Sequence, residues 1–394
     1  MLKLQSVGMK VLIKQVLNLK EIILRRILKM SKLVIKTDKL KEMVSRAVKG
    51  ASNNKLLPIT ELMCIEVKNN KLTLLTTDYT NYLYITEKVE NEDFYVVTRV
   101  DQFSKLIGKM TSENVTLEIV DDKLCITGNG KYSIELPIDV DGEMVKYPNP
   151  MSEIVLDDNE SKILNLTTAK LILTVNKAAL ATSMEVPCYT GYYTADKVVT
   201  TDTYKICSTN INVLDTATLI SPEMMNLMDT MTSEKIEVYR KDNNLICISP
   251  DCCIFGAVLE GIEDFAIEAI TSLVEQEFNS MCKIPKSAIL GVLERINLFV
   301  GTYDNSEIYM TFTTDGLMCS SKSSSGTEVI PYADSKDFTY FTCAIDINML
   351  ISQIKANASD MIELWYGADN AIKITDGNVT QIIALAEDDR VNAE

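Results

Sequence analysis

The chain has 394 residues, of which 46% are apolar, and a formal net charge of -16. This length and apolar content suffice for two or three domain cores, and the low numbers of Gly and Pro argue against disorder. The chain contains no histidine, which removes the commonest general base and the commonest nitrogen ligand of zinc and so argues against an enzyme.

The ten cysteines are scattered and form no C-x-x-C pair. Most of them lie inside apolar, strand-like segments, which indicates reduced core cysteines in a cytoplasmic protein. From Met30 onward no apolar run approaches the length of a membrane span. We therefore predict a cytoplasmic protein that neither enters a membrane nor holds a cofactor or metal.

Residues 1–29 differ from the rest, because basic residues are spread among Leu, Ile and Val, and Glu21 is the only acid. An amphipathic membrane-surface helix or a basic arm for DNA would have this composition. Arg25 and Arg26 lie shortly before Met30, and AGG codons at these positions would spell a bacterial ribosome-binding site. We therefore favour a translated leader upstream of a start at Met30; a signal peptide fits less well because its basic residues would be confined to the front.

A segment that ends in Thr-Thr-Asp occurs three times, at Lys71–Asp78, Lys197–Asp202 and Ile308–Asp315. The aspartates are 124 and then 113 residues apart, a spacing too long for a solenoid and typical of whole domains. Each aspartate is expected to bond the backbone of a turn at the end of a strand rather than to act as a catalytic carboxylate.

A helical pattern precedes each triplet, at residues 38–50, 176–184 and 285–299. In the first, apolar residues recur with a 3.6-residue period, while Lys39 and Arg46 fall on the opposite face. A second helix follows each triplet and has its own start signal. These signals are a capping-box variant at Thr98–Asp101, Ser221 followed by Pro222, and Asp346 before Ile347.

A pair of alternating strands with a polar turn follows each second helix, at residues 115–136, 235–259 and 361–385. The fold class is therefore α+β, with three tandem domains of two helices packed on two small antiparallel sheets. The predicted domains are 30–150, 151–275 and 276–394, and the last ends in an acidic tail at 387–394.

Four stretches carry a resemblance to a known family: Leu57–Ile59, Lys71–Asp78, Val198–Ile206 and Gln381–Ala386. In this order, and with three repeats, the chain resembles the bacterial DNA sliding clamp, the beta subunit of DNA polymerase III, over residues 30–386. The resemblance implies three DNA-clamp domains per chain and a head-to-tail homodimeric ring. Duplex DNA would pass through a hole lined by helices and would be held by its phosphates without sequence reading.

Such a ring is a replication processivity factor without catalytic activity. An acidic exterior is compatible with basic helix faces around the hole, because local charge and not net charge attracts phosphate. The candidate DNA-binding residues on these faces and loops are Lys39, Arg46, Lys49, Lys55, Lys105, Lys109, Lys177, Lys286, Arg295 and Lys355.

The resemblance also implies that the polymerase alpha subunit and the clamp loader insert a short hydrophobic peptide between the second and third domains. Position by position, the partner-peptide pocket consists of Thr190, Thr201, Thr203, Tyr204, Lys205, Ile206, Pro222, Leu227, Met349, Ile382, Ala384 and Leu385. The chain departs from the family where Gly, His and Arg become Thr203, Tyr204 and Lys205 and where a leucine becomes Thr190. These changes indicate a phage or mobile-element clamp with a dedicated partner.

Two other functions remain open. A clamp-like scaffold or decoy would bind replication proteins without loading on DNA, and retained basic helix faces argue against it. A metal-dependent nuclease would use a pair of acids such as Asp121 and Asp122 or Asp157 and Asp158. Each pair lies in a predicted turn or linker, so we do not favour an enzyme.

Overall fold

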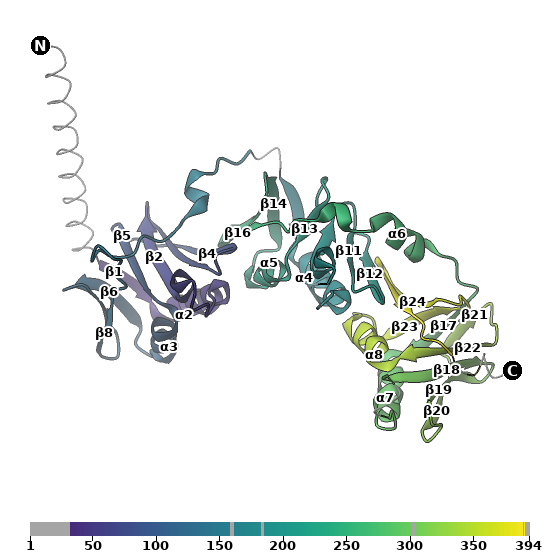
Figure 1. The fold of residues 1–394 in the computed structure, drawn as a ribbon. Coiled ribbons are helices and arrows are strands. Elements are labelled where there is room, and N and C mark those ends of the chain that lie inside the picture. Colours follow the sequence, from purple (N-terminus) through teal and green to yellow (C-terminus); the bar gives the residue numbers. More distant parts are fainter. Residues whose placement is uncertain (1–31, 158–160, 183–184, 302–304, 389, 391–394) are drawn as a thin grey trace, which may run out of the picture. The chain divides into compact units, whose positions relative to one another are not determined.

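The computed structural model describes residues 32–157, 161–182, 185–301, 305–388 and 390 (Figure 1). The predicted leader at residues 1–29 lies outside the described residues. So do Asp158 of the acidic pair and residues 389 and 391–394 of the acidic tail.

The chain divides into two compact units. The first contains residues up to 161 together with 227–257, and the second contains 162–226 together with 258–394. The predicted middle domain, 151–275, therefore contributes to both units. The division into three domains remains a prediction, because the boundaries of the compact units fall elsewhere.

Antiparallel strands form two sheets in the first unit. One sheet has the order β1-β6-β7-β8, and the other contains the order β5-β2-β3-β4-β16-β15-β14. In the second sheet, β4 pairs with β16 and places Tyr82 opposite Phe255, so the sheet continues from the first repeat into the middle one. The strands are β1 (Lys32–Lys36), β2 (Leu62–Lys68), β3 (Lys71–Thr77), β4 (Asn81–Lys88), β5 (Phe94–Arg99), β6 (Asn114–Val120), β7 (Lys123–Thr127), β8 (Lys131–Glu135), β14 (Lys235–Lys241), β15 (Asn244–Ser249) and β16 (Cys252–Ala257).

The second unit contains a sheet of order β13-β10-β11-β12-β25-β24-β23-β17-β21 and a smaller sheet of order β20-β19-β18-β22. Its large sheet also joins two repeats, because β12 pairs with β25 and places Ile206 opposite Ile382. The strands of this unit are β9 (Lys162–Asn165), β10 (Tyr192–Thr194), β11 (Val198–Thr201), β12 (Lys205–Thr209), β13 (Thr218–Ile220), β17 (Ser280–Pro285), β18 (Glu307–Thr313), β19 (Gly316–Ser321), β20 (Thr327–Ile330), β21 (Asp334–Lys336), β22 (Phe341–Asp346), β23 (Met361–Tyr366), β24 (Ala371–Asp376) and β25 (Val379–Ala384).

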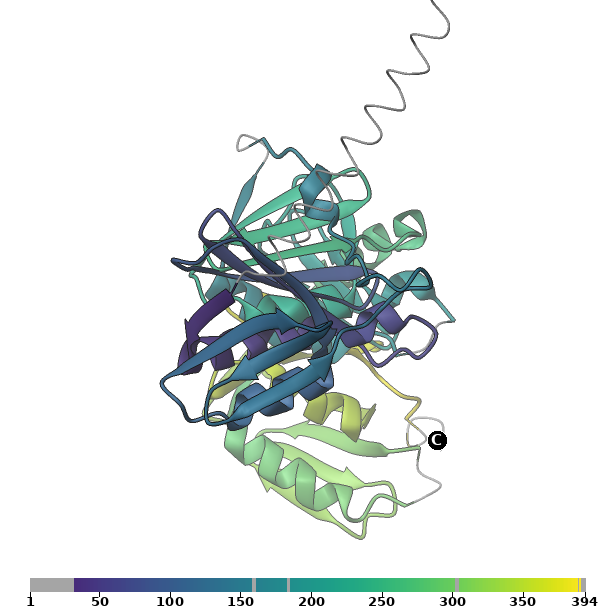
Figure 2. The same ribbon diagram turned by 90° about the vertical axis from the view of Figure 1, so that its left-hand side faces the viewer.

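Helices α2 and α3 of the first unit lie side by side (Figure 1, Figure 2). Their apolar residues recur every three or four positions, so one face of each helix is buried, and the charged residues other than Arg46 stay at least partly accessible. The buried face of α3, for example, consists of Val100, Phe103 and Ile107. The helical segments are α2 (Thr37–Ala47), η1 (Val48–Gly50), η2 (Pro58–Glu61), α3 (Val100–Lys109), η3 (Pro150–Glu153) and η7 (Met228–Thr230).

Helices cover both faces of the large sheet in the second unit, and Figure 1 shows α4 and α6 on opposite sides of β11 and β12. Neighbouring residues of β12 face opposite ways, as a strand requires. Cys207 packs with Val175 of the α4 side, whereas Ile206 packs with Ile270 of α6. The helical segments are α4 (Leu166–Val175), η5 (Asn176–Ala179), η6 (Pro187–Thr190), α5 (Pro222–Leu227, which ends at the division), η8 (Ile262–Asp264), α6 (Ile267–Glu275), α7 (Lys286–Asn297) and α8 (Ile347–Ala356).

The helix predicted at 176–184 is placed wrongly. The helix of the middle repeat is α4, which ends at Val175, and only a short turn, η5, follows. The physical reason is the buried side chain of Asn176, whose amide donates to the carbonyls of Val198 (3.2 Å) and Cys207 (3.1 Å). This side chain fixes the end of the helix against β11 and β12, where the prediction placed its beginning.

The other element predictions are confirmed in part. Helices occur at the predicted 38–50 and 285–299. The group of strands that follows the second helix of each repeat contains three strands rather than the predicted two. Ser221 accepts a hydrogen bond from the backbone N–H of Met224 (3.1 Å), and Asp346 accepts one from Asn348 (2.8 Å), so both are caps. The capping box at Thr98–Asp101 is wrong, because α3 begins after Arg99 without a side-chain cap.

The cysteines are free, and most are buried. Among the described residues, no group of His, Cys, Asp and Glu has the geometry of a metal site. No helix in the described part of the chain is long and apolar enough to cross a membrane.

Candidate functional site

The helices differ in charge from the rest of the chain. Six of them, α2, α3, α4, α5, α7 and α8, together carry nine Lys or Arg and five Asp or Glu. The whole chain carries 39 Lys or Arg and 55 Asp or Glu. These helices are therefore locally basic on an acidic protein, which favours an anionic ligand near them.

Lys39 on α2 is held by two carboxylates. Its Nζ lies 2.7 Å from Glu87 and 3.1 Å from Glu42. The hydrogen bond to Glu87 is the main reason why the pKa of Lys39 is raised. A phosphate that binds Lys39 would have to compete with both carboxylates.

Arg46 on α2 is a structural residue. Only 9% of it is exposed, and its guanidinium donates to Asp251 (2.6 Å), to the carbonyl of Thr230 (2.9 Å) and to Glu42 (3.3 Å). Burial opposes ionisation of Asp251, but hydrogen bonds from Thr232 and Arg46 outweigh it and lower the pKa of this carboxyl. We therefore remove Arg46 from the candidate DNA-binding residues, since the arginine joins α2 to the segment 227–257.

Three further candidates, Lys49, Lys105 and Lys109, lie on the surface of the first unit. Two of them pair with an aspartate. Lys49 lies 3.2 Å from Asp229 and Lys105 lies 2.6 Å from Asp101. These pairs are solvent-exposed and weak, so a phosphate can replace the carboxylate. Lys109, one turn after Lys105, is exposed, and its ammonium has no hydrogen-bond or ion-pair partner among the described residues.

Lys55 is exposed in the loop between η1 and η2 and also lacks such a partner within the described part of the chain. Two lysines that the prediction did not include, the half-buried Lys41 on α2 and the exposed Lys170 on α4, also lack such a partner among the described residues. Lys170 was missed because the helix that carries it was predicted ten residues too late. Lys177 is exposed on η5 and donates to the side chain of Asn226 (3.3 Å).

The candidates on α7 and α8 have different environments. Lys286 donates to the carbonyls of Lys355 (3.1 Å) and Asn357 (2.5 Å), so it caps the carboxyl end of α8 and is not free to bind DNA. Lys355 pairs with Glu294 at 2.9 Å. Arg295 makes a two-pronged contact with Glu328, at 2.7 and 2.8 Å.

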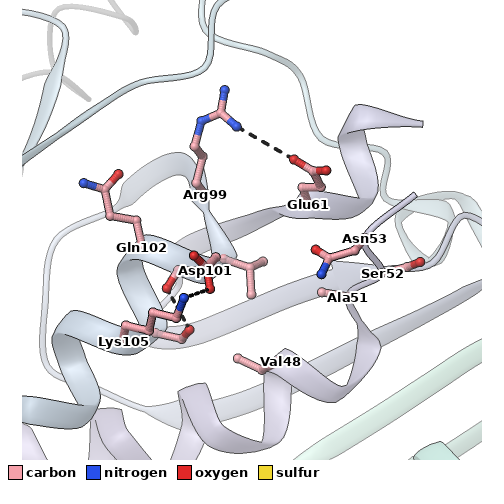
Figure 3. Close-up of a pocket in the computed structure, with 11 residues that line it drawn as sticks. Val48, Ala51, Ser52, Asn53, Glu61, Arg99, Asp101, Gln102 and Lys105 are labelled. Atoms are coloured by element: carbon pink, nitrogen blue, oxygen red, sulfur yellow. Dashed lines mark hydrogen bonds and ion pairs between the residues drawn. The ribbon is translucent and has the colours of Figure 1, made fainter. Parts of the chain in front are cut away.

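A recess of about 850 Å³ lies beside the start of α3 (Figure 3). Its charged groups pair with one another: Arg99 lies 3.8 Å from Glu61, and Lys105 contacts Asp101. The other residues that line the recess, among them Asn53, are uncharged. Its lining contains balanced charge, so the recess is not by itself an anion site.

The hairpin between β11 and β12 is the centre of the predicted peptide pocket. Thr201 Oγ1 donates to the carbonyl of Lys205 (2.8 Å) and accepts from the N–H of Thr203 (3.0 Å). Asp202 Oδ1 accepts from the N–H groups of Tyr204 (3.0 Å) and Lys205 (2.7 Å). Thr203 has a φ of +80°, a strained conformation for a β-branched residue. Tyr204 is 62% exposed at the tip.

The first repeat contains the same turn. Thr77 Oγ1 donates to the carbonyl of Asn81 (2.6 Å), and Asp78 Oδ1 accepts from the N–H groups of Thr80 and Asn81. The predicted backbone-bonding role of the aspartate is thus confirmed in two repeats. In the third repeat the backbone N–H of Asp315 donates to Thr313 instead (3.3 Å).

Lys205 faces inward rather than toward a ligand. Its Nζ lies 3.1 Å from Asp202 and donates to the carbonyl of Ala178 (2.9 Å), a carbonyl that also accepts from Gln353 (3.0 Å). Thr201 is only 2% exposed. Both residues therefore fix the hairpin, and Thr203 and Tyr204 are the accessible part of it.

The apolar part of the predicted pocket is covered by α6. Ile206 and Ile382 belong to one cluster with Phe265 and Ile270. No helix was predicted here, and the predicted domain boundary at 275 falls on the last residue of α6. The signal was present, because Ile267, Ile270 and Val274 recur with helical spacing.

Other predicted pocket residues are more dispersed. Met349 and Leu385 are partly buried against the core of the third repeat rather than against the Ile206 cluster. Thr190 is partly buried, and its hydroxyl donates to the carbonyl of Pro187 (2.7 Å). Ala384 donates its N–H to the carbonyl of Tyr204 (2.8 Å), so the terminal strand does meet the hairpin.

The predicted pocket residues on α5 do not belong to the apolar cluster around Ile206. Pro222 is the first residue of this helix and is absent from the apolar cluster around Ile206. Leu227 is buried in the first unit. The element that packs on the Ile206 side of the hairpin is α6, through Phe265 and Ile270, and the assignment of Pro222 and Leu227 to the pocket stays a prediction.

Comparison with known proteins finds a family match for one part of the chain and a fold match for most of it. Residues 31–145 match the family model described as the DNA polymerase III beta subunit, N-terminal domain. A comparison with curated protein sequences gives no match.

Solved structures agree over most of the chain. The DNA polymerase sliding clamp of Bacillus subtilis aligns with a TM-score of 0.78 at 15% identity and covers 91% of this chain and 99% of the clamp. The beta chain of Streptococcus pneumoniae aligns with a TM-score of 0.79 at 14% identity, and the alignment covers 91% of this chain and 100% of the beta chain. The beta subunit of Thermotoga maritima aligns with a TM-score of 0.76 at 16% identity, and the alignment covers 91% of this chain and 99% of the beta subunit.

The chain therefore has the α+β fold of the DNA sliding clamps. Residues 31–145 of it are similar to the N-terminal domain of the DNA polymerase III beta subunit.

Proposed function

We propose that this protein is a DNA sliding clamp, a ring that encircles duplex DNA and tethers a replicative DNA polymerase. The observation that carries the proposal is the agreement in fold with bacterial clamps along 99–100% of their length, together with the family match of residues 31–145. The basic surplus on the helices of an acidic chain supports it. The proposed role is non-catalytic and cytoplasmic.

The ring would be a head-to-tail dimer of chains with three clamp domains each. β8 is the edge of one sheet in the first unit, and β20 is the edge of one sheet in the second. An unpaired edge can add a strand from another chain. Apolar side chains are exposed around both edges: Tyr132 on β8, Val329 on β20, and Leu298 after α7. These features support closure of the ring by β8 of one protomer and β20 of its partner.

The helix faces would hold DNA through its phosphates and without reading its sequence. The residues that remain accessible for this role are Lys39, Lys41, Lys49, Lys55, Lys105, Lys109, Lys170, Lys177, Arg295 and Lys355. Several of them are paired with carboxylates, so contacts to DNA would replace weak surface ion pairs. This exchange would keep the attraction small enough for sliding.

The partner site would lie where the β11–β12 hairpin meets β25 and α6. The exposed ring of Tyr204 and the strained backbone of Thr203 are accessible there, and the apolar cluster around Ile206 lies beneath α6. A short hydrophobic peptide from the polymerase alpha subunit or the clamp loader would bind through a few apolar anchors. The altered hairpin suits a dedicated partner, as in a phage or mobile-element replisome.

This site is tested with Tyr204→Ala, because an exposed ring can be removed without a cavity in the core. Ile206 is only 5% exposed, so the variant Ile206→Asp would damage the fold as well as the site. We expect Tyr204→Ala to reduce polymerase stimulation at least tenfold while the dimer and the melting temperature stay unchanged. Stimulation equal to that of the unaltered chain would place the partner site elsewhere.

The second candidate is a clamp-like scaffold that binds replication proteins without loading on DNA. The pairing of Lys39, Lys105 and Arg295 with carboxylates favours it. Light scattering of the full-length chain and anisotropy of a fluorescent 30-base-pair duplex separate the two. A dimer whose DNA affinity falls steeply with salt is the clamp, whereas a dimer without measurable DNA affinity at 50 mM salt is the scaffold.

A further inference from the structure

The end of the chain joins three separate elements of the second unit. The N–H groups of residues 384, 385 and 386 donate in turn to the carbonyls of Tyr204 (2.8 Å), Asn370 (2.9 Å) and Ala344 (2.8 Å). These acceptors belong to the β11–β12 hairpin, the turn between β23 and β24, and β22. The terminal segment therefore connects the hairpin to the third repeat, in addition to the pairing of β12 with β25.

Two described residues of the acidic tail, Asp388 and Arg390, lie against the third repeat. The guanidinium of Arg390 lies over the ring of Tyr309, 3.9 Å from its centroid. It contacts Asp388 at 2.6 Å and points toward the carbonyl of Cys343 (3.4 Å) and the hydroxyl of Thr311 (3.5 Å). Tyr309 and Thr311 belong to β18, and Cys343 belongs to β22. We call residues 385–388 and 390 the C-terminal strap.

The ion pair of the strap is not an ordinary surface pair. The side chain of Asp388 is 9% exposed and that of Arg390 is 35% exposed. Hydrogen bonding from Arg390 is the main reason why the pKa of Asp388 is lowered. A partly buried guanidinium that both stacks on an aromatic ring and binds a carboxylate is a stronger anchor than either contact alone.

We propose that Arg390 is a positioning residue of the partner-peptide site, because it fastens the strap and so holds residues 384–386 against the hairpin that carries Tyr204. Strand ends fray unless they are tied down, and here the anchor, Arg390, lies five residues beyond Leu385, the last predicted pocket residue. The inference rests on the proposed function, since the strap matters for binding only if the hairpin and β25 receive a peptide.

Three full-length variants test the role of Arg390. Arg390→Ala removes the anchor. Arg390→Lys keeps the charge but loses the planar guanidinium that stacks on Tyr309 and binds both oxygens of Asp388. Lys283→Ala is the matched control, because Lys283 pairs with Glu363 on another part of the same unit (2.7 Å) and does not touch the strap.

Two readouts separate the strap from the site. Hydrogen exchange reports the amides of residues 384–386. Fluorescence anisotropy reports binding of a labelled hexapeptide that contains leucine and ends in phenylalanine. For Arg390→Ala we expect exchange of these amides to become about tenfold faster and peptide affinity to fall about tenfold, which corresponds to about 1.4 kcal/mol. Arg390→Lys should fall between this variant and the unaltered chain, and Lys283→Ala should match the latter.

Each other outcome contradicts a defined statement. Unchanged exchange in Arg390→Ala would show that Arg390 does not hold the strap. Faster exchange with unchanged peptide affinity would make Arg390 an anchor of the fold without a role in positioning the site. Failure of the unaltered chain to bind the hexapeptide would overturn the proposed peptide site, while hydrogen exchange would still decide whether the strap is held by Arg390.

Discussion

Replacing Lys55 and Lys109 by alanine should weaken binding to DNA mainly through its salt dependence. Both ammonium groups are exposed and have no partner among the described residues, so they are the candidates most available to phosphate. Each phosphate contact contributes about 0.9 to the slope of log affinity against log salt. With two protomers in a ring, the double variant should lower this slope by about 1.8 if one protomer contacts DNA at a time and by about 3.6 if both do.

Between 50 and 200 mM salt, the unaltered chain should therefore lose about 10- to 150-fold more affinity for DNA than the double variant does. The assay is fluorescence anisotropy of a labelled duplex at four salt concentrations. The matched control is Lys68→Ala with Lys88→Ala, which removes the same charge from exposed strand ends of the same unit. Both double variants should keep their stability within about 0.5 kcal/mol. A slope equal to that of the unaltered chain would refute the assignment of Lys55 and Lys109.

Four further outcomes follow from the structure. Arg46→Ala should destabilise the first unit by about 2–3 kcal/mol in urea unfolding, because it leaves the half-buried Asp251 without its cation. The pKa of Asp251 is lowered from its ordinary 3.8. The stability that this carboxylate contributes is therefore present above pH 3.8 and is lost as the pH falls through the lower pKa of the folded state. Asp251→Asn should remove this pH dependence. Leu298→Asp, at an 81% exposed position, should convert dimers to monomers in light scattering without lowering the melting temperature of the chain. Thr203→Gly should raise stability by up to about 1 kcal/mol by relieving the positive φ, and a loss of stability there would show that the hairpin is not strained.

The sequence was sufficient to predict elements whose pattern is local. The helix at 38–50 was recognisable because Leu40, Met43 and Val44 alternate with charged residues at helical spacing, and all three are buried. The repeated Thr-Thr-Asp turn was recognisable because Asp78 and Asp202 bond backbone groups only two or three residues away.

The sequence was insufficient where the environment comes from distant residues. Arg46 lies on the charged face of its helix, and its burial depends on Asp251, which is 205 residues away. α4 has the sequence LTTAKLILTV, in which apolar residues occupy every side, so its pattern could not define the helix. The sharing of large sheets between repeats is equally non-local, since Ile206 and Ile382 become neighbours only through pairing of β12 with β25.

The central claim is that the protein is held on DNA by topology. The direct measurement is retention of the full-length chain on nicked circular DNA through gel filtration at 200 mM salt, before and after a restriction enzyme cuts the circle once. A sliding clamp stays with the intact circle and is released when the circle is linearised. Retention that is the same on circular and linear DNA, or absent from both, would contradict the account.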